Sequence, residues 1–283
     1  MPDKKPKYVL FIHGIGPQEP HYSDRLIQKL WPSGLPADVK SREMLYYDIF
    51  ETMNAKTEMD KWAAMAAPVL NDLVALVWPG AQLEPALATT LKDCVAHVLY
   101  FATSVDVRTR ILNEFKKELV AILKEAPGGF ARNVEITVVS HSLGTAVAYL
   151  GLHDIVKDPV LGLQKDVVVT SLYTLAAPIE LVRVVGSKLP QPLAIPNLTD
   201  GLRRPTRVNA SGKVETNIGN WFSFRHLLDP VASLAALKGR PLLDNDDIAP
   251  FSVIDAQLAK VHDFGRYIDQ ARTEILSHVE ATS

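Results

Sequence analysis

Residues 134–152 read VEITVVSHSLGTAVAYLGL, which is the pattern of a strand, a sharp turn and a helix in direct succession. The first part is β-branched and apolar and predicts a buried strand. The last part has the small and apolar residues of a buried helix. Ser142 lies between the two, with the small residues Ser140 and Gly144 two positions on either side. This setting is typical of a nucleophile elbow, a turn so tight that larger neighbours would collide with adjacent backbone.

The predicted turn makes Ser142 the candidate nucleophile. It would lift the hydroxyl above the end of the sheet and point it at a helix N-terminus, where free N–H groups stabilise negative charge. A serine hydroxyl is a poor nucleophile at neutral pH, so a base must remove its proton. The alternative interpretation is an ordinary serine N-cap, which the same position before a helix also favours.

A second motif, His-Gly-Ile-Gly at residues 13–16, directly follows the apolar run Tyr8–Ile12. The run predicts a buried strand, and the glycines let the following backbone approach a reacting group closely. Acyl transfer builds negative charge on the former carbonyl oxygen, and each N–H aimed at that oxygen contributes about 3 kcal/mol. We expect the backbone N–H groups of Ile15 and Leu143 to form this oxyanion hole. A plain glycine turn is the alternative.

Histidine is the usual base for a serine nucleophile, because its pKa lies near neutral pH. Of the eight histidines, His262 fits best, since it follows the last predicted strand and opens the last predicted helix. The acid should lie between Ser142 and His262 on a loop after a strand. Asp229 precedes Pro230, which holds it in an extended conformation suited to orienting an imidazole. We therefore expect a catalytic triad of Ser142, Asp229 and His262.

The chain as a whole predicts an α/β protein with a mostly parallel central sheet flanked by helices. Its 283 residues are enough for a single domain, 1–283. Ligands of such sheets bind beyond the carboxyl ends of the strands, where both motifs lie. Strands are expected at residues 8–12, 39–47, 134–139, 167–175, 221–225 and 248–254, and helices at 24–30, 107–123 and 263–279.

Residues 52–104 are expected to form a helical insert, because one helix suffices for the crossover between the second and third strands. Two helical patterns occupy the insert, at 62–77 and 87–101. We expect a cap that shields the pocket and supplies an acyl-binding surface; packing of both helices on the sheet is the alternative. Pro68 and nearby polar residues argue against a transmembrane segment, although weak contact with a membrane surface stays open.

Composition excludes several other classes of function. A net charge of −2 gives no electrostatic reason to expect nucleic acid. The single cysteine, Cys94, excludes an intrachain disulfide and a cysteine zinc cluster. The sequence shows no metal-ligand spacing, and residues 14–16 lack the last glycine of a dinucleotide fingerprint, so we expect no cofactor.

The apolar run near the N-terminus is too short for a signal peptide, which predicts a cytoplasmic protein. The oligomeric state is not indicated.

These motifs resemble the α/β-hydrolase superfamily, in particular its lipase and esterase branch. The resemblance spans nearly the whole chain, from Tyr8 to the final helix. Ser140 stands where the family usually has glycine, and we expect the family's first two strands to be absent, as in smaller lipases. The resemblance implies the same nucleophile, acid and base roles for Ser142, Asp229 and His262, and oxyanion donation by the backbones of Ile15 and Leu143.

The resulting functional hypothesis is a serine hydrolase that cleaves carboxylic esters through an acyl-enzyme intermediate. Its partner would be a small-molecule or lipid ester. A thioesterase or an amidase on the same triad is one alternative, since the sequence does not separate these substrates. A catalytically inactive binding module with a hydrolase-like fold is another, although all three residue types of the triad are present.

Overall fold

The computed structural model describes residues 5–53, 55–77, 85–125, 134–155, 169–179, 206–208, 214–226, 248–251 and 262–280. Within these ranges, six parallel strands form one sheet in the order β2-β1-β3-β4-β7-β8. The α/β class expected from the sequence is therefore confirmed. The strands of this sheet are β1 (Lys7–Ile12), β2 (Val39–Met44), β3 (Glu135–His141), β4 (Val169–Leu175), β7 (Ile218–His226) and β8 (Ile248–Phe251).

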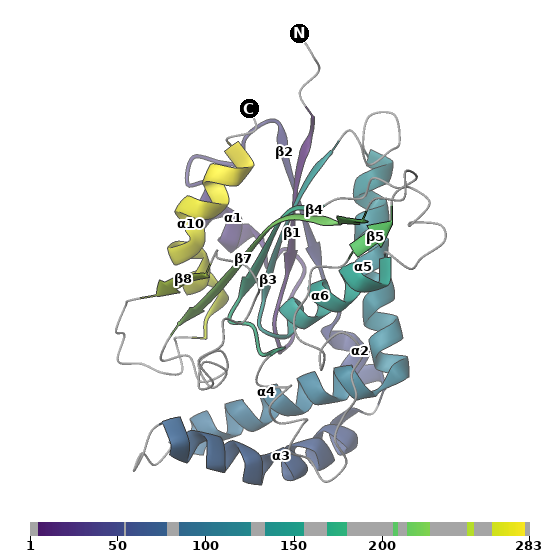
Figure 1. Ribbon diagram of the computed structural model, residues 1–283, viewed down its shortest axis with the longest axis vertical. Coiled ribbons are helices and arrows are strands. Elements are labelled where there is room, and N and C mark those ends of the chain that lie inside the picture. Colours follow the sequence, from purple (N-terminus) through teal and green to yellow (C-terminus); the bar gives the residue numbers. More distant parts are fainter. Residues whose placement is uncertain are drawn as a thin grey trace.

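Helices cover both faces of the sheet (Figure 1). Helices α1 and α10 pack together on one face, and α5 and α6 pack together on the other. A short antiparallel pair, β5 (Thr206–Val208) and β6 (Val214–Thr216), stands apart from the main sheet. The described helices are α1 (Asp24–Leu30), α2 (Tyr47–Thr52), α3 (Ala55–Val77), α4 (Pro85–Thr103), α5 (Val105–Glu125), α6 (Leu143–Ile155) and α10 (Phe264–Glu280).

The side chains of the central strand β1 divide between two separate hydrophobic cores, one on each face of the sheet. Successive side chains of a strand point to opposite faces of the sheet. Tyr8, Leu10 and Ile12 accordingly belong to the core on the α5 and α6 side. Val9 and Phe11 belong to the core on the α1 and α10 side. All six residues of β1 are buried, as expected for a strand covered on both faces.

Strand β2 ends at Met44, three residues before the expected boundary. The reason is Tyr46, which is fully buried and stacks on the ring of His13 at 4.3 Å between centroids. Its hydroxyl donates to the carbonyl oxygens of His13 and Gly14 at 2.8 and 3.2 Å. The chain therefore turns after β2 and places Tyr46 under the loop that follows β1, and Tyr47 begins α2.

The expected insert contains α3 and α4, which pack against each other. Figure 1 shows this pair across the end of the molecule toward which β1 and β3 run. Residues 94–102 of α4 are buried, and most of them join the same core as β1, α5 and α6. Helix α3 lies farther out, with Met65 exposed. The described part of α4 is thus packed on the body of the protein, while α3 packs on α4.

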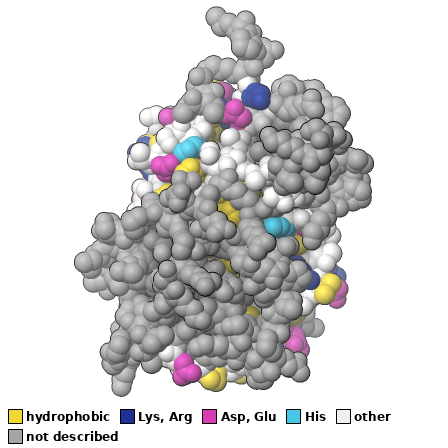
Figure 2. Space-filling model, viewed as in Figure 1, with side chains coloured by type: hydrophobic (Ala, Val, Ile, Leu, Met, Phe, Trp, Pro, Cys, Tyr) yellow, Lys and Arg dark blue, Asp and Glu magenta, His cyan; other side chains and the backbone are white. Residues whose placement is uncertain are grey.

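Charged side chains are scattered over the described surface on the face that Figure 2 shows. On the face seen in Figure 2, acidic and basic side chains of the described residues are spread out instead of gathering in one patch. No helix within the described ranges is both long enough and apolar enough to cross a membrane.

Candidate active site

Ser142 occupies a strained turn between β3 and α6. Its φ angle is 51°, in the left-handed region that costs a residue other than glycine about 1–2 kcal/mol. Main-chain contacts hold it there: its N–H donates to the carbonyl oxygen of Leu175 at 2.9 Å, and its carbonyl oxygen accepts from the N–H and hydroxyl of Thr145. The side chain is buried, with 1% of the residue exposed. The local geometry is that of the nucleophile elbow predicted from the sequence.

The two small neighbours of Ser142 have separate structural reasons. A Cβ atom at Gly144 would lie 2.4 Å from the carbonyl oxygen of His13 and 2.7 Å from that of Ile12, because the end of β1 presses against the first turn of α6. The hydroxyl of Ser140 donates to the carbonyl oxygen of Tyr173 at 2.8 Å. This hydrogen bond gives the buried hydroxyl at position 140 a partner.

Gly144→Ala should lower the free energy of unfolding by about 3 kcal/mol, because the added methyl group must displace backbone atoms of β1. Gly16→Ala is the matched control: its φ is +103°, but nothing lies within 4 Å of the added Cβ, so only backbone strain of about 1 kcal/mol is expected. Urea denaturation of both variants measures the difference. Equal losses would contradict a steric role for Gly144.

His262 lies against Ser142, with Nε2 2.9 Å from the serine Oγ. It stands in the turn just before α10 and is half-buried. When the ring carries its proton on Nδ1, the Ser142 hydroxyl donates to Nε2, which is the arrangement in which imidazole can accept the hydroxyl proton. Among the described histidines, His262 has the ring that is hydrogen bonded to Ser142.

Aromatic side chains pack beside the imidazole of His262. The ring of His141 lies 4.9 Å from it and is stacked on Phe264 at 4.9 Å with an interplanar angle of 11°. These separations are typical of attractive ring contacts. His141, which neighbours Ser142 in sequence, thus contributes a buried ring that limits where His262 can move. The sequence alone did not indicate this contact.

The expected oxyanion donors, Ile15 and Leu143, lie close to Ser142 in the chain or in space. A Cβ atom at Gly14 would be 2.7 Å from Cβ of Ser142, so the loop after β1 is in contact with the serine. Ile15 follows in this loop, and Leu143 is the first residue of α6. Neither residue's N–H donates a hydrogen bond to another described residue. Their role as oxyanion donors stays a prediction.

The remaining predicted site residue, Asp229, lies outside the described residues. Its role as the acid stays a prediction.

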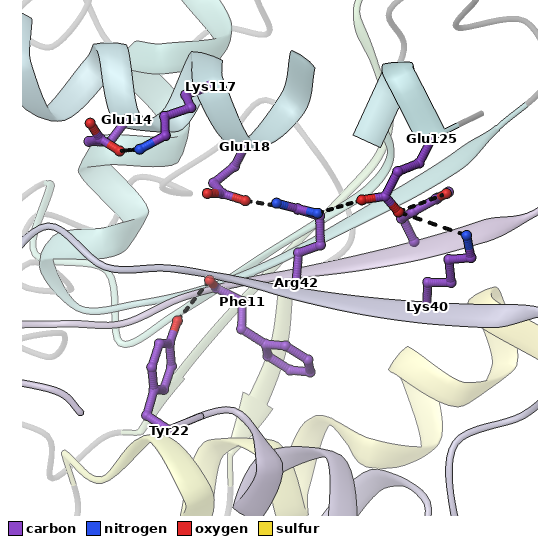
Figure 3. Close-up of polar contacts among 9 residues, drawn as sticks. Phe11, Tyr22, Lys40, Arg42, Glu114, Lys117, Glu118 and Glu125 are labelled. Carbon is purple, nitrogen blue, oxygen red and sulfur yellow. Dashed lines mark hydrogen bonds and ion pairs between the residues drawn. The ribbon is translucent and has the colours of Figure 1, made fainter. Parts of the chain in front are cut away.

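His13, which the sequence indicated only as part of the oxyanion loop, is a structural support of that loop. It is 1% exposed, its Nδ1 is 2.7 Å from the carbonyl oxygen of Gly14, and its ring is enclosed by Tyr46 and Tyr22. The hydroxyl of Tyr22 in turn donates to the carbonyl oxygen of Phe11 at 2.7 Å (Figure 3). Burial lowers the pKa of His13 to about 4.

The lowered pKa of His13 predicts a pH-dependent stability. In the unfolded chain the ordinary pKa is 6.5, so the unfolded state binds more protons between about pH 6.5 and 4. The contribution of neutral His13 to the free energy of unfolding is therefore fully present above pH 6.5. It falls as the pH drops to about 4, by roughly 3 kcal/mol in total. Burial also lowers the pKa of His97, so His13→Gln should flatten only part of the slope. Urea denaturation across this pH range measures the free energy of unfolding. The same slope against pH in the variant and in the parent protein would contradict this role of His13.

The strand order, the elbow and the contact between Ser142 and His262 define a protein with an α/β-hydrolase fold. Residues 63–185 match the family model for lipase (class 3), and this stretch includes the elbow. The matched residues, somewhat less than half of the chain, are similar to this family, which lies within the α/β-hydrolase superfamily of serine hydrolases. The matched family consists of lipase-like hydrolases that act on esters. No curated protein and no solved structure matches the sequence.

Proposed function

We propose that this protein hydrolyses carboxylic esters through an acyl-enzyme intermediate. Ser142 is the nucleophile, His262 is the general base and acid, and Asp229 orients His262. The observation that carries the proposal is the 2.9 Å contact between Ser142 Oγ and His262 Nε2, which joins residues 120 positions apart at the carboxyl end of the sheet. A strained turn holds the serine in this position.

The proposed reaction has two halves. Ser142 Oγ attacks the ester carbonyl carbon while His262 Nε2 takes its proton, and the N–H groups of Ile15 and Leu143 stabilise the oxyanion. The C–O bond then breaks, and His262 gives its proton to the departing alkoxide. Water attacks the acyl-enzyme, with His262 again as the base, and Ser142 is regenerated as the carboxylic acid leaves.

Residues 52–104 are proposed to cover this site. In support, α3 and α4 lie at the end of the molecule toward which the strands run (Figure 1). The nucleophile itself is buried. A covered site excludes water and strengthens the oxyanion contacts, because electrostatic attraction is stronger in a medium of low dielectric constant than in water.

The test is hydrolysis of 4-nitrophenyl esters of increasing acyl length, together with labelling by a fluorophosphonate probe. We expect turnover of at least one ester and a single labelled serine, Ser142. A preference for long chains would support an acyl-binding role for the insert. Thioester and amide analogues in the same assay separate the thioesterase and amidase alternatives. Folded protein that hydrolyses none of them and is not labelled would contradict the proposal and favour a binding module.

A further inference from the structure

A cavity of about 610 Å³ lies beside the loop that follows β1. Its wall includes His13, Pro17 and Gln18 from this loop, and residues from the end of β2, from α2 and from α5. It is thus located at the carboxyl ends of β1 and β2, the edge where parallel sheets bind their ligands. The proposed reaction uses no side chain of this wall.

The wall of the cavity is strongly acidic. Asp48 and Glu51 of α2 form no hydrogen bond or ion pair with another described residue through their carboxylates. The other carboxylates have partners: Figure 3 shows Glu118 paired with Arg42 and Glu114 paired with Lys117, each at 2.8 Å. The ionisable side chains of the wall other than His13 and Tyr47 are Glu43, Asp48, Glu51, Glu114, Glu118 and Lys117.

His13 adds an independent sign of a ligand. Its Nδ1 is engaged by the carbonyl oxygen of Gly14, so Nδ1 carries the ring proton and Nε2 holds a lone pair. This Nε2 is buried and accepts no hydrogen bond from a described residue, although the residue is 99% buried and lines the cavity. Buried acceptors of this kind are rarely left without a donor.

We propose that the cavity binds an organic cation that carries N–H donors, namely a primary ammonium or guanidinium group. Such a group offers positive charge to Asp48 and Glu51 and to the face of Tyr47, which also lines the cavity. Its N–H reaches Nε2 of His13 when the imidazole ring moves toward the cavity, because that atom is buried in the structure. A metal ion fits less well, because no three acidic, histidine or cysteine side chains of the described residues converge on one point.

The cavity and the nucleophile share one loop. Gly14 contacts Ser142, Ile15 supplies a proposed oxyanion donor, and Pro17 and Gln18 belong to the wall of the cavity. The loop thus connects the wall of the cavity to the nucleophile through five consecutive residues, 14–18. We therefore assign the cation to the ester substrate itself, as a charged group on its alcohol or acyl part; this step rests on the proposed hydrolase function. A free amine is the other source of the same chemistry.

Two pairs of isosteric esters test the assignment. The first pair is 6-aminohexyl butyrate and heptyl butyrate, and the second is butyl 6-aminohexanoate and butyl heptanoate. The first pair carries the charge on the alcohol part and the second on the acyl part, so we expect an effect in one of them. In that pair, kcat/KM of the cationic ester should exceed that of its neutral isostere at least about fivefold at low ionic strength. The advantage should shrink as salt is added, because exposed charges are screened.

Two double variants distinguish an effect of the carboxylates of the cavity from an effect of the overall surface charge. Asp48→Asn with Glu51→Gln should remove most of the advantage and leave turnover of heptyl butyrate unchanged. The matched control is Glu58→Gln with Asp60→Asn, which makes the same chemical changes on α3, outside the wall of the cavity. It should keep the advantage.

Calorimetric titration with 1,6-diaminohexane tests the site without any turnover. Binding that the Asp48 and Glu51 variant loses supports the site, even if no ester is hydrolysed and the proposed function fails. Diamine binding with equal rates for both members of each pair would overturn the substrate assignment in favour of a free amine. No diamine binding and equal rates would overturn the site.

Discussion

Ser142→Ala should lower kcat for the best nitrophenyl ester by about 10⁴-fold or more and abolish fluorophosphonate labelling. The substitution removes only the hydroxyl. The contacts that shape the turn are made by the main chain, namely the N–H of Ser142 to Leu175 and the carbonyl of Ser142 to Thr145. The variant should therefore fold and melt like the parent protein. Steady-state kinetics, intact-protein mass after labelling and a thermal melt measure these three outcomes.

Ser140→Ala is the matched control, because it removes another buried serine hydroxyl two residues away. That hydroxyl donates to the carbonyl oxygen of Tyr173, so its loss should cost about 1 kcal/mol of stability. The kcat value should change only a few-fold. Labelling that persists in Ser142→Ala, or that disappears in Ser140→Ala, would show that the nucleophile is wrongly assigned.

The elbow was predictable because its determinants are local. Strand, turn and helix follow one another within residues 134–152, and the small residues that the turn requires lie within two positions of Ser142. The end of β2 was not predictable in the same way. Tyr46 continues an apolar pattern, yet its burial under His13, more than thirty positions away, ends the strand early. Strand boundaries depend on such tertiary contacts, whereas the existence of a strand depends on its own pattern.

The surroundings of the site depend on contacts between distant segments. His141, His262 and Phe264 meet because α10 folds back beside the elbow, and a sequence pattern gives no measure of ring-to-ring distance. The acidic cavity has the same origin, since Asp48 and Glu114 come from helices that are separated by the whole insert. Asp229 stays a prediction from chain order and from the proline that follows it.

His262→Ala should reduce kcat to about the level of Ser142→Ala, and the double variant should be no slower than either single variant. In the proposed mechanism the serine and the histidine act as one unit, so that without Nε2 at 2.9 Å the hydroxyl would have no base to take its proton. Asp229→Asn should also lower kcat, since an amide would favour the wrong tautomer of His262. Measuring kcat for all three single variants and the double variant tests the unit as a whole.

The matched control for His262 is His141→Phe, because the ring of His141 lies 4.9 Å from that of His262. Phenylalanine keeps a flat ring between His262 and Phe264 but has no nitrogen that could act as a base. If His262 is the base, this variant should keep kcat within about tenfold, since only the packing beside the imidazole changes. If His141→Phe abolished turnover while His262→Ala retained it, the base would be His141, and the proton path from Ser142 to His262 would have to be abandoned.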